Sequence, residues 1–189
     1  MWDRDIFLWL NFDGGSFMDG LMLFASGKLT WLPLYLLLLY VVWRKGGWRG
    51  VTFFLLGAVA IVALSDMVAG VFKHTGLLKG LLPDFPARLR PSHTPELEGL
   101  IHNLAKGGRY GTVSAHAATT LGVAAWSIYC VPQRWVYVVM PLYALLVAYS
   151  RIYLGVHFPQ DILLGWGVGA LSTGVVIAVA MGLNRAKNR

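Results

Sequence analysis

The sequence predicts an all-α integral membrane protein, a bundle of five transmembrane helices with a sixth as the main alternative. Its 189 residues are 57% hydrophobic and only 13% charged, and the mean hydropathy of +0.60 is too high for a soluble domain of this size. The net charge of +7 comes from short basic clusters between apolar runs. Such clusters are typical of loops that orient membrane helices, so we exclude a nucleic-acid-binding protein.

Several apolar segments are long enough to be membrane helices, since a span needs about 20 mostly apolar residues, or somewhat fewer where aromatic residues anchor its ends. The predicted spans are residues 29–43, 51–72, 113–131, 135–149 and 161–183. They form one transmembrane domain over residues 29–183, with a polar loop at residues 73–112 and a basic tail at residues 184–189.

The first 28 residues have a different composition, because four aspartates alternate with large aromatic side chains. This mixture suits the membrane interface better than the hydrocarbon core. We therefore expect residues 1–28 to form an N-terminal interfacial segment with one or two surface helices. The alternative topology adds a sixth, less apolar span over residues 6–26.

The basic residues at 44–49, at 134 and in the tail at 184–189 fall on one side of the predicted membrane domain. Short loops rich in lysine and arginine stay in the cytoplasm, so the loop at 73–112 and the stretch at 150–160 are expected on the outer side. Both outer segments also contain arginines, which the topology does not require there. An anionic ligand on the outer side accounts for them.

The outer loop contains a predicted helix start. Thr94 suits the N-cap and Pro95 the first helical position. Apolar residues then recur at helical spacing, at Leu97, Leu100, Ile101 and Leu104. The pattern predicts a short amphipathic helix on the outer membrane surface.

Two further helix starts face the same compartment. Thr112 or Ser114 caps the third span and leaves His116 near its first turn, and the fifth span begins with Asp161 in its first turn, shortly after His157. Helix N-termini carry unpaired N–H groups and the positive end of the helix dipole, so together with arginines they favour a phosphate-like anion. The two histidines supply groups that transfer protons near neutral pH.

These residues resemble the signatures of a known family. The arrangement Ser150-Arg151, five residues, His157, three residues, Asp161 is similar to the third signature of the type 2 phosphatidic acid phosphatase superfamily, membrane lipid phosphatases related to vanadium haloperoxidases. Arg90-Pro91 resembles the end of the first signature, and Ser114-Ala115-His116 resembles the second. The three occur in the family's order, and the resemblance covers roughly residues 50–183.

The sequence departs from the family pattern at two places. Val113 and Ala115 stand where the second signature has proline and glycine. Pro83 stands where the first signature has a lysine, seven positions before the arginine. An insertion in this region leaves Lys73 and Lys79 as the two candidates for the displaced lysine.

The resemblance implies a role for each candidate. His157 is expected to attack phosphorus, Asp161 to orient and stabilise His157, and His116 to protonate the departing oxygen and then activate water. The resemblance implies that the phosphoryl oxygens are held by Arg90, Arg151, Ser114 and either Lys73 or Lys79. It requires no metal or other cofactor, and vanadate or phosphate is expected to act as an inhibitor.

The expected function is removal of phosphate from a membrane lipid on the periplasmic or extracellular side of a bacterial inner membrane. Undecaprenyl diphosphate is the expected substrate, and phosphatidylglycerophosphate, phosphatidic acid and lipid A phosphates are the alternatives. A non-catalytic protein that binds or transports lipid phosphates is the competing class. The two histidines and Asp161 favour an enzyme, because binding an anion requires only the arginines and the helix ends.

Overall fold

The computed structural model describes residues 2–27 and 29–187, and most of these residues are helical, with one long loop between residues 71 and 115 that contains no α-helix. The α-helices are α1 (Trp2–Leu10), α2 (Gly15–Ser26), α3 (Leu32–Val71), α4 (Ala115–Cys130), α5 (Arg134–Tyr153) and α6 (Pro159–Lys187), and short 3₁₀ turns lie at Pro91–His93 and Pro95–Leu97. The described residues contain no β-strand beyond one isolated bridge between Leu89 and Tyr110. The predicted all-α class is confirmed.

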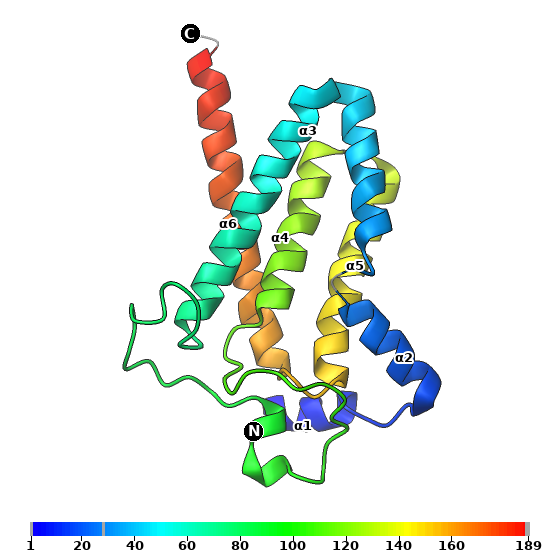
Figure 1. Ribbon diagram of the computed structural model, residues 1–189, viewed down its shortest axis with the longest axis vertical. Helices are drawn as coiled ribbons and strands as arrows, with labels where there is room; N and C mark the ends of the chain where they lie inside the picture. Colours follow the sequence, from blue (N-terminus) through cyan, green and yellow to red (C-terminus); the bar gives the residue numbers. More distant parts are fainter. Residues whose placement is uncertain (1, 28, 188–189) are drawn as a thin grey trace.

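Helix α3 is a hairpin of two arms. It kinks at Gly47, whose φ of +57° lies in the left-handed region that glycine tolerates. Figure 1 shows the chain reversing at this kink, so that the two arms correspond to the predicted spans at 29–43 and 51–72. The basic residues at 44–49 therefore lie at the end of the bundle where α5 begins and α6 ends.

Three of the described helices, α3, α5 and residues Pro159–Leu183 of α6, are long and apolar enough to cross a membrane. Together they make a multi-pass membrane protein. Helix α4 has only 16 residues, fewer than the roughly 20 of a typical span, but it packs against α3, α5 and α6. Helix α6 extends through Lys187, so most of the predicted basic tail is helical, whereas residues 188–189 lie outside the described part of the chain.

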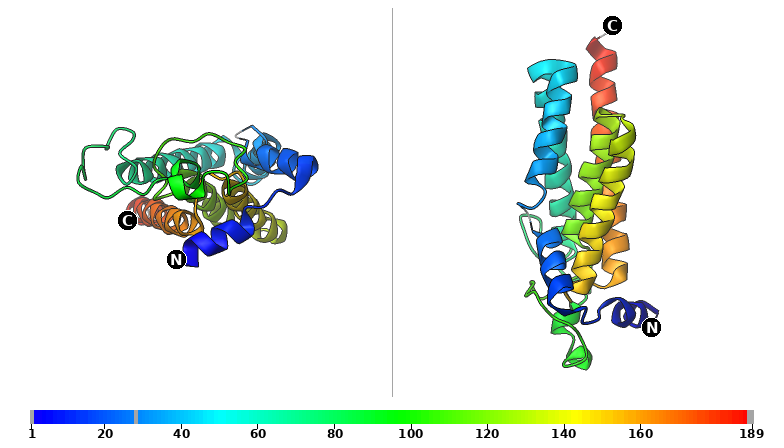
Figure 2. Two further views of the ribbon diagram at one scale, coloured as in Figure 1. Left: turned by 90° about the horizontal axis from the view of Figure 1, so that it is seen from below. Right: turned by 90° about the vertical axis from the view of Figure 1, so that its right-hand side faces the viewer.

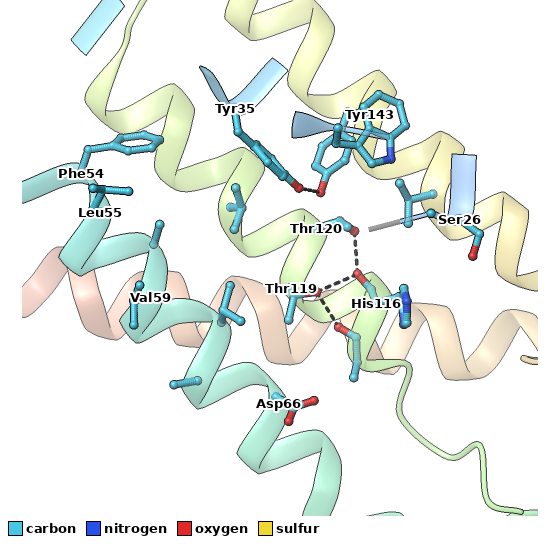
Figure 3. A pocket seen from close by; sticks show the side chains of 18 of the residues that line it. Ser26, Tyr35, Phe54, Leu55, Val59, Asp66, His116, Thr119, Thr120 and Tyr143 are labelled. Carbon is cyan, nitrogen blue, oxygen red and sulfur yellow. Dashed lines mark hydrogen bonds between the residues drawn. The ribbon is translucent and has the colours of Figure 1, made fainter. Parts of the chain in front are cut away.

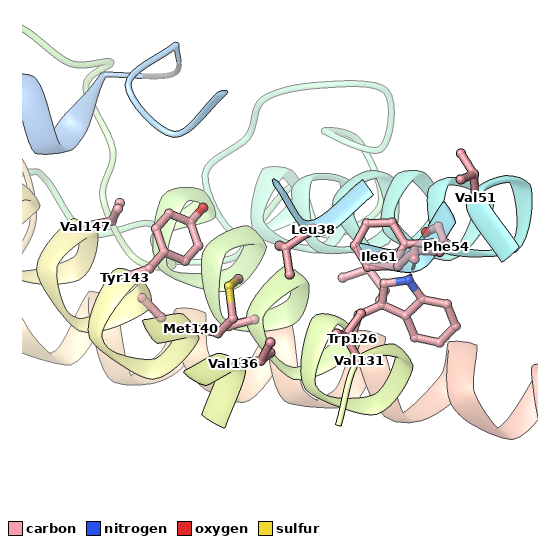
Figure 4. Packing of buried hydrophobic residues seen from close by; sticks show 13 residues of the cluster. Leu38, Val51, Phe54, Ile61, Trp126, Val131, Val136, Met140, Tyr143 and Val147 are labelled. Atoms are coloured by element: carbon pink, nitrogen blue, oxygen red, sulfur yellow. Dashed lines mark hydrogen bonds between the residues drawn. The ribbon is translucent and has the colours of Figure 1, made fainter. Parts of the chain in front are cut away.

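The bundle core lies between α3, α4 and α5 (Figure 4). Trp126 of α4 is completely buried, its indole N–H donates a 2.9 Å hydrogen bond to the carbonyl of Phe54, and its ring lies where a side chain at Gly57 would be. Helices α4 and α6 also approach closely. Gly165 permits this approach, because a Cβ at this position would be 2.5 Å from the Ser114 carbonyl oxygen. This contact fixes the start of α4 against the first turns of α6.

The N-terminal segment forms two short helices at the end of the bundle away from the basic turn. Helix α1 lies transverse to the long helices (Figure 2), and α2 packs beside α5. The helices have 9 and 12 residues, and at about 1.5 Å per residue neither spans a hydrocarbon core of roughly 30 Å. The structure therefore contains no single spanning helix over residues 6–26.

The outer loop differs from the prediction. The prediction of an amphipathic helix that starts at Thr94 is wrong, since only the 3₁₀ turn Pro95–Leu97 forms there. The Thr94 hydroxyl donates to the carbonyl of Arg90, so it caps no helix, and Gly99 adopts a φ of +75° that turns the chain. Leu97 is buried beneath this turn, whereas Leu100 points outward and is 64% exposed.

Candidate active site

The predicted site residues, with the exception of Lys79, come together at the end of the bundle that carries α1. This end contains the first turns of α4 and α6, the last turn of α5 and the long loop after α3, as Figure 1 shows. The structure differs from the prediction at Arg151, which belongs to the last turn of α5 and not to a loop. The arginine is therefore anchored on a packed helix.

His157 and Asp161 form a buried pair between α5 and α6. Pro159 begins α6, and this places Asp161 in its first turn. The Nδ1 atom of His157 lies 3.1 Å from Oδ2 of Asp161, and the same oxygen accepts a 3.1 Å hydrogen bond from the backbone N–H of Phe158. Because the carboxylate accepts, the ring donates from Nδ1, and Nε2 carries the lone pair.

Burial keeps His157 in its neutral form. The side chain is 1% exposed, and this desolvation lowers its pKa to about 4, although the charge and hydrogen bond of Asp161 act in the opposite direction. Arg90 and Arg151 also lower this pKa, because their positive charges disfavour a protonated ring. At neutral pH the imidazole is therefore the free base that a nucleophile requires.

Two arginines act on His157 from different parts of the chain, Arg90 from the outer loop and Arg151 from the last turn of α5. The Nε of Arg90 donates to the carbonyl of Tyr110 at 3.0 Å, and Arg151 donates to the hydroxyl of Ser26. The Nε of Arg151 is buried and has no hydrogen-bond partner among the described residues. A buried guanidinium with a free donor is suited to bind an anion.

Lys73 joins this cluster and Lys79 does not. Lys73 follows the last turn of α3 and is only 9% exposed. Burial and the charge of Arg90 lower the pKa of Lys73 below its ordinary value. The charge of Arg151 also lowers this pKa, whereas the charge of Asp161 raises it. Lys79 lies in the exposed part of the loop. Of the two candidate lysines, Lys73, seventeen positions before Arg90, is therefore the one that lies near the other predicted site residues.

Ser114 is the N-cap of α4. Its hydroxyl accepts from the N–H of Ala117 at 3.3 Å, and its own N–H donates to the carbonyl of Asp161 at 2.9 Å. The residue is completely buried. These bonds give Ser114 a clear structural role, which is to join the first turn of α4, where His116 lies, to the first turn of α6.

A cavity of about 930 Å³ extends from His116 between the two arms of α3, with α4 and α5 as its other walls. Its lining is mainly apolar but includes His116 of α4 and Asp66 of α3, and Figure 3 shows both of them away from the hydrogen-bonded Tyr35 and Tyr143 hydroxyls. The volume and the apolar walls match the pockets that hold small apolar ligands or parts of larger ones.

Arg88 and Asp3 also lie at this site, although neither was predicted from the sequence. One guanidinium nitrogen of Arg88 donates to Oδ1 of Asp161, and the other donates to Oδ2 of Asp3 in α1. Two signals were available in retrospect. Arg88 stands two positions before Arg90 in the stretch RLRP, and Asp3 lies four residues before Phe7, on the same face of α1.

A separate group of possible metal ligands lies at Asp13, Asp19 and His102, whose ligand atoms are all within 4.8 Å of one another. One oxygen of Asp19 already accepts hydrogen bonds from His102 at 2.8 Å and from the Tyr153 hydroxyl at 2.7 Å. These bonds connect α2 with the outer loop and the end of α5. The group contains none of the residues predicted for phosphate chemistry.

The sequence pattern of the PAP2 superfamily matches residues 54–185, which include every predicted site residue. The chain belongs to the PAP2 superfamily. The resemblance seen in the three signatures is thereby confirmed.

Individual PAP2 proteins resemble this chain over most of its length. A lipid A 4'-phosphatase of Bacteroides thetaiotaomicron is 29% identical over 88% of this chain and 72% of its own length. An undecaprenyl-diphosphatase of Sulfolobus acidocaldarius is 27% identical, again over 88% of this chain and 72% of its own length. The crystal structure of a transmembrane PAP2-type phosphatidylglycerolphosphate phosphatase from Bacillus subtilis has a TM-score of 0.66 at 20% identity and covers 95% of this chain and 85% of that one. The family and its named phosphatases identify this PAP2 chain as a membrane phosphatase.

Proposed function

We propose that this PAP2 protein is a metal-independent lipid phosphatase that works through a phosphohistidine at His157. The observation that carries the proposal is the buried pair of His157 and Asp161, with Arg90 and Arg151 acting electrostatically on His157 and Lys73 acting on Asp161. A neutral imidazole oriented by a carboxylate is a nucleophile, and three converging cations stabilise the charge of a phosphoryl group in transfer.

The first step forms an N–P bond and breaks the bond between phosphorus and the lipid oxygen. Nε2 of His157 attacks phosphorus, the ring becomes positively charged, and Asp161 stabilises it through Nδ1–H. The departing oxygen leaves with its electron pair and takes a proton from His116. Proton transfer of this kind contributes about 10²–10⁴-fold to a rate.

The second step restores the enzyme. His116, now neutral, removes a proton from a water molecule, whose oxygen attacks the phosphohistidine. The N–P bond breaks, its electron pair returns to Nε2 of His157, and inorganic phosphate leaves. Arg90, Arg151 and Lys73 hold the phosphoryl oxygens in both steps, while Ser114 fixes the start of α4.

The cavity beside His116 supports a lipid substrate. With the phosphate at the cation cluster, the adjoining apolar part of the lipid fits between the arms of α3 (Figure 3). Longer chains extend into the bilayer, because the outer faces of the bundle carry many exposed apolar residues, such as Leu56, Leu163 and Leu171.

The proposed topology has five crossings, two by the arms of α3 and one each by α4, α5 and α6. The basic segments lie at the end of the bundle opposite the site (Figure 1), which favours a cytoplasmic position for them and an outer position for the site. The enzyme then acts on the periplasmic or extracellular side of a bacterial inner membrane.

Undecaprenyl diphosphate is our first candidate substrate, and the similar undecaprenyl-diphosphatase supports it. A lipid A 4'-phosphate is the second candidate, because a lipid A 4'-phosphatase matches the same share of the chain at slightly higher identity. The two differ chemically: the first leaving group is a phosphate ester, whereas the second is a sugar alkoxide that needs a proton on departure.

Phosphate release from purified protein in detergent, with a metal chelator present, tests the proposal. The panel contains undecaprenyl diphosphate, lipid A, phosphatidylglycerophosphate and phosphatidic acid. Wild type and the control His93→Ala, in which an exposed loop histidine is removed, are expected to release phosphate, and His157→Ala is not. Loss of activity in chelator, or release by His157→Ala, contradicts the mechanism. Tight lipid binding without release from any lipid favours the non-catalytic alternative.

A further inference from the structure

Helix α1 is attached to the catalytic end of the bundle through a buried carboxylate. Asp3 is only 5% exposed. Its Oδ1 accepts a 2.8 Å hydrogen bond from the backbone N–H of Gln160 in the first turn of α6, and its Oδ2 accepts from Arg88. The side chain therefore acts as an N-terminal cap of α6, supplied by another helix.

Arg88 connects Asp3 to the pair of Asp161 and His157. It bridges Asp3 and Asp161 with separate nitrogens, and Asp161 uses its other oxygen for His157 and the Phe158 N–H. The result is a continuous chain of contacts, Asp3 to Arg88 to Asp161 to His157. Each of the two carboxylates is anchored by a backbone N–H as well.

The partners of Arg88 distinguish it from the phosphate-binding arginines. Arg90 donates to backbone carbonyls and Arg151 to a serine hydroxyl, so both keep their full positive charge for an anion. Arg88 faces two carboxylates, which offset its charge and fix its planar fork. Its geometry suits orientation of Asp161 and not direct contact with a phosphoryl oxygen.

Aromatic packing holds α1 against the same loop. The rings of Phe7 and Phe158 meet edge to face with centroids 5.1 Å apart, and the guanidinium of Arg88 lies 4.4 Å from the Phe158 ring centroid. At the other end of α1, the Asn11 amide donates to the carbonyls of Ile152 and Tyr153. Helix α1 is thus fastened at both ends over the segment that carries His157.

We propose that Asp3, acting through Arg88, is a positioning residue for the Asp161–His157 pair, so that the N-terminal helix is part of the catalytic machinery. The inference rests on the proposed function of His157 as the nucleophile. It assigns Asp3 no contact with substrate. Its loss is expected to slow the chemical step and to leave binding of the lipid phosphate unchanged.

Asp3→Asn tests this inference, with Asp13→Asn as the matched control. Asp13 is exposed, and its oxygen accepts from Gly15 N–H, a bond that asparagine retains. We expect Asp3→Asn to lower kcat about tenfold with KM unchanged, which is the size expected when one hydrogen bond to a charged group is lost. Asp13→Asn is expected to match wild type. Unchanged kcat in Asp3→Asn, or a raised KM at constant kcat, overturns the inference.

A double-mutant cycle tests the route through Arg88. Arg88→Gln alone is expected to lower kcat more than Asp3→Asn, and the combination is expected to be no slower than Arg88→Gln, because both changes interrupt one chain. Arg88→Lys is expected to restore little, since an ammonium group cannot bridge two carboxylates as a guanidinium fork does. Additive losses contradict the route. If Asp3→Asn does not fold, Arg88→Gln and Arg88→Lys probe the same contact from its other side.

A spectroscopic measurement separates this inference from the proposed function. The ¹⁵N resonance of the His157 Nδ1–H, assigned by its absence in His157→Ala, reports the hydrogen bond to Asp161 without any turnover. We expect Asp3→Asn to shift this resonance and Asp13→Asn to leave it in place. An unshifted resonance refutes the positioning role. A shifted resonance in a protein that releases no phosphate upholds the positioning and refutes the phosphatase mechanism.

Discussion

Gly111→Ala is the substitution whose effect the structure specifies most directly. Gly111 lies in the outer loop, and its N–H donates to the carbonyl of Arg88 at 2.8 Å. A Cβ at this position would be 2.7 Å from Oδ2 of Asp161 and 3.4 Å from Cγ of Arg90. The first distance is too short for a carbon and an oxygen in contact, so either the loop or the carboxylate must move.

The expected displacement is several tenths of an ångström, at the oxygen that orients His157. A misplacement of about 1 Å costs about 10²-fold in rate, so we expect kcat to fall about tenfold or more. The control is Gly108→Ala in the same loop, where a Cβ would have no neighbour within 4 Å.

The assay compares kcat for phosphate release by wild type, Gly111→Ala and Gly108→Ala, with thermal melting of each protein in detergent. Equal melting temperatures together with a loss confined to Gly111→Ala support the geometry. Wild-type kcat in Gly111→Ala refutes the close approach of this loop to Asp161, and an equal loss in both variants refutes the specific steric argument.

Three more predictions concern the other site residues. Lys73→Ala is expected to raise KM about tenfold and Lys79→Ala to leave it unchanged, as expected for loss of one charge-assisted contact to phosphate; the reverse result in steady-state kinetics assigns the role to Lys79. His116→Ala is expected to slow release from a lipid A phosphate by about 10²-fold or more and from undecaprenyl diphosphate much less, because only the sugar alkoxide needs a proton. Equal losses on the two lipids argue against His116 as the acid. Burial lowers the pKa of His157 to about 4, and in the proposed mechanism the ring attacks as the free base. The value of kcat/KM is therefore expected to fall as the pH drops through about 4, whereas a fall centred near 6.5 contradicts the burial of the ring.

The general fold could be predicted because a membrane span requires a long run of apolar residues, which is visible in the local sequence. Long apolar runs and basic loops can be recognised from short stretches of sequence, and all five predicted segments fall on helices or helix arms with bounds shifted by a few residues. Helix α4 differs from the others only in length, because its 16 residues are fewer than the roughly 20 of a typical span, and it packs against α3, α5 and α6. The prediction of a helix after Thr94 was also wrong for a local reason. The spacing of the apolar residues favours a helix, but Gly99 adopts a positive φ that turns the chain.

The site was predictable only where its residues occur in short motifs. His157 and Asp161 are four residues apart across a helix start, so their contact follows from local geometry. The role of Lys73 depends on how an inserted segment folds, and sequence spacing suggested Lys79 equally. Asp3 lies 85 residues before Arg88, and nothing in either local sequence indicates that the two side chains meet. Long-range pairs of this kind require the structure.

Trapping the covalent intermediate tests the central claim most directly. His116→Ala protein is mixed with undecaprenyl diphosphate that carries ³²P in its terminal phosphate, in chelator, and quenched in denaturant, since loss of the group that activates water is expected to slow the second step. We predict alkali-stable, acid-labile label on the peptide that contains His157, and none when His157→Ala is added to His116→Ala. Label on a different residue, or rapid phosphate release by wild type with no labelled protein at any time, contradicts the phosphohistidine mechanism.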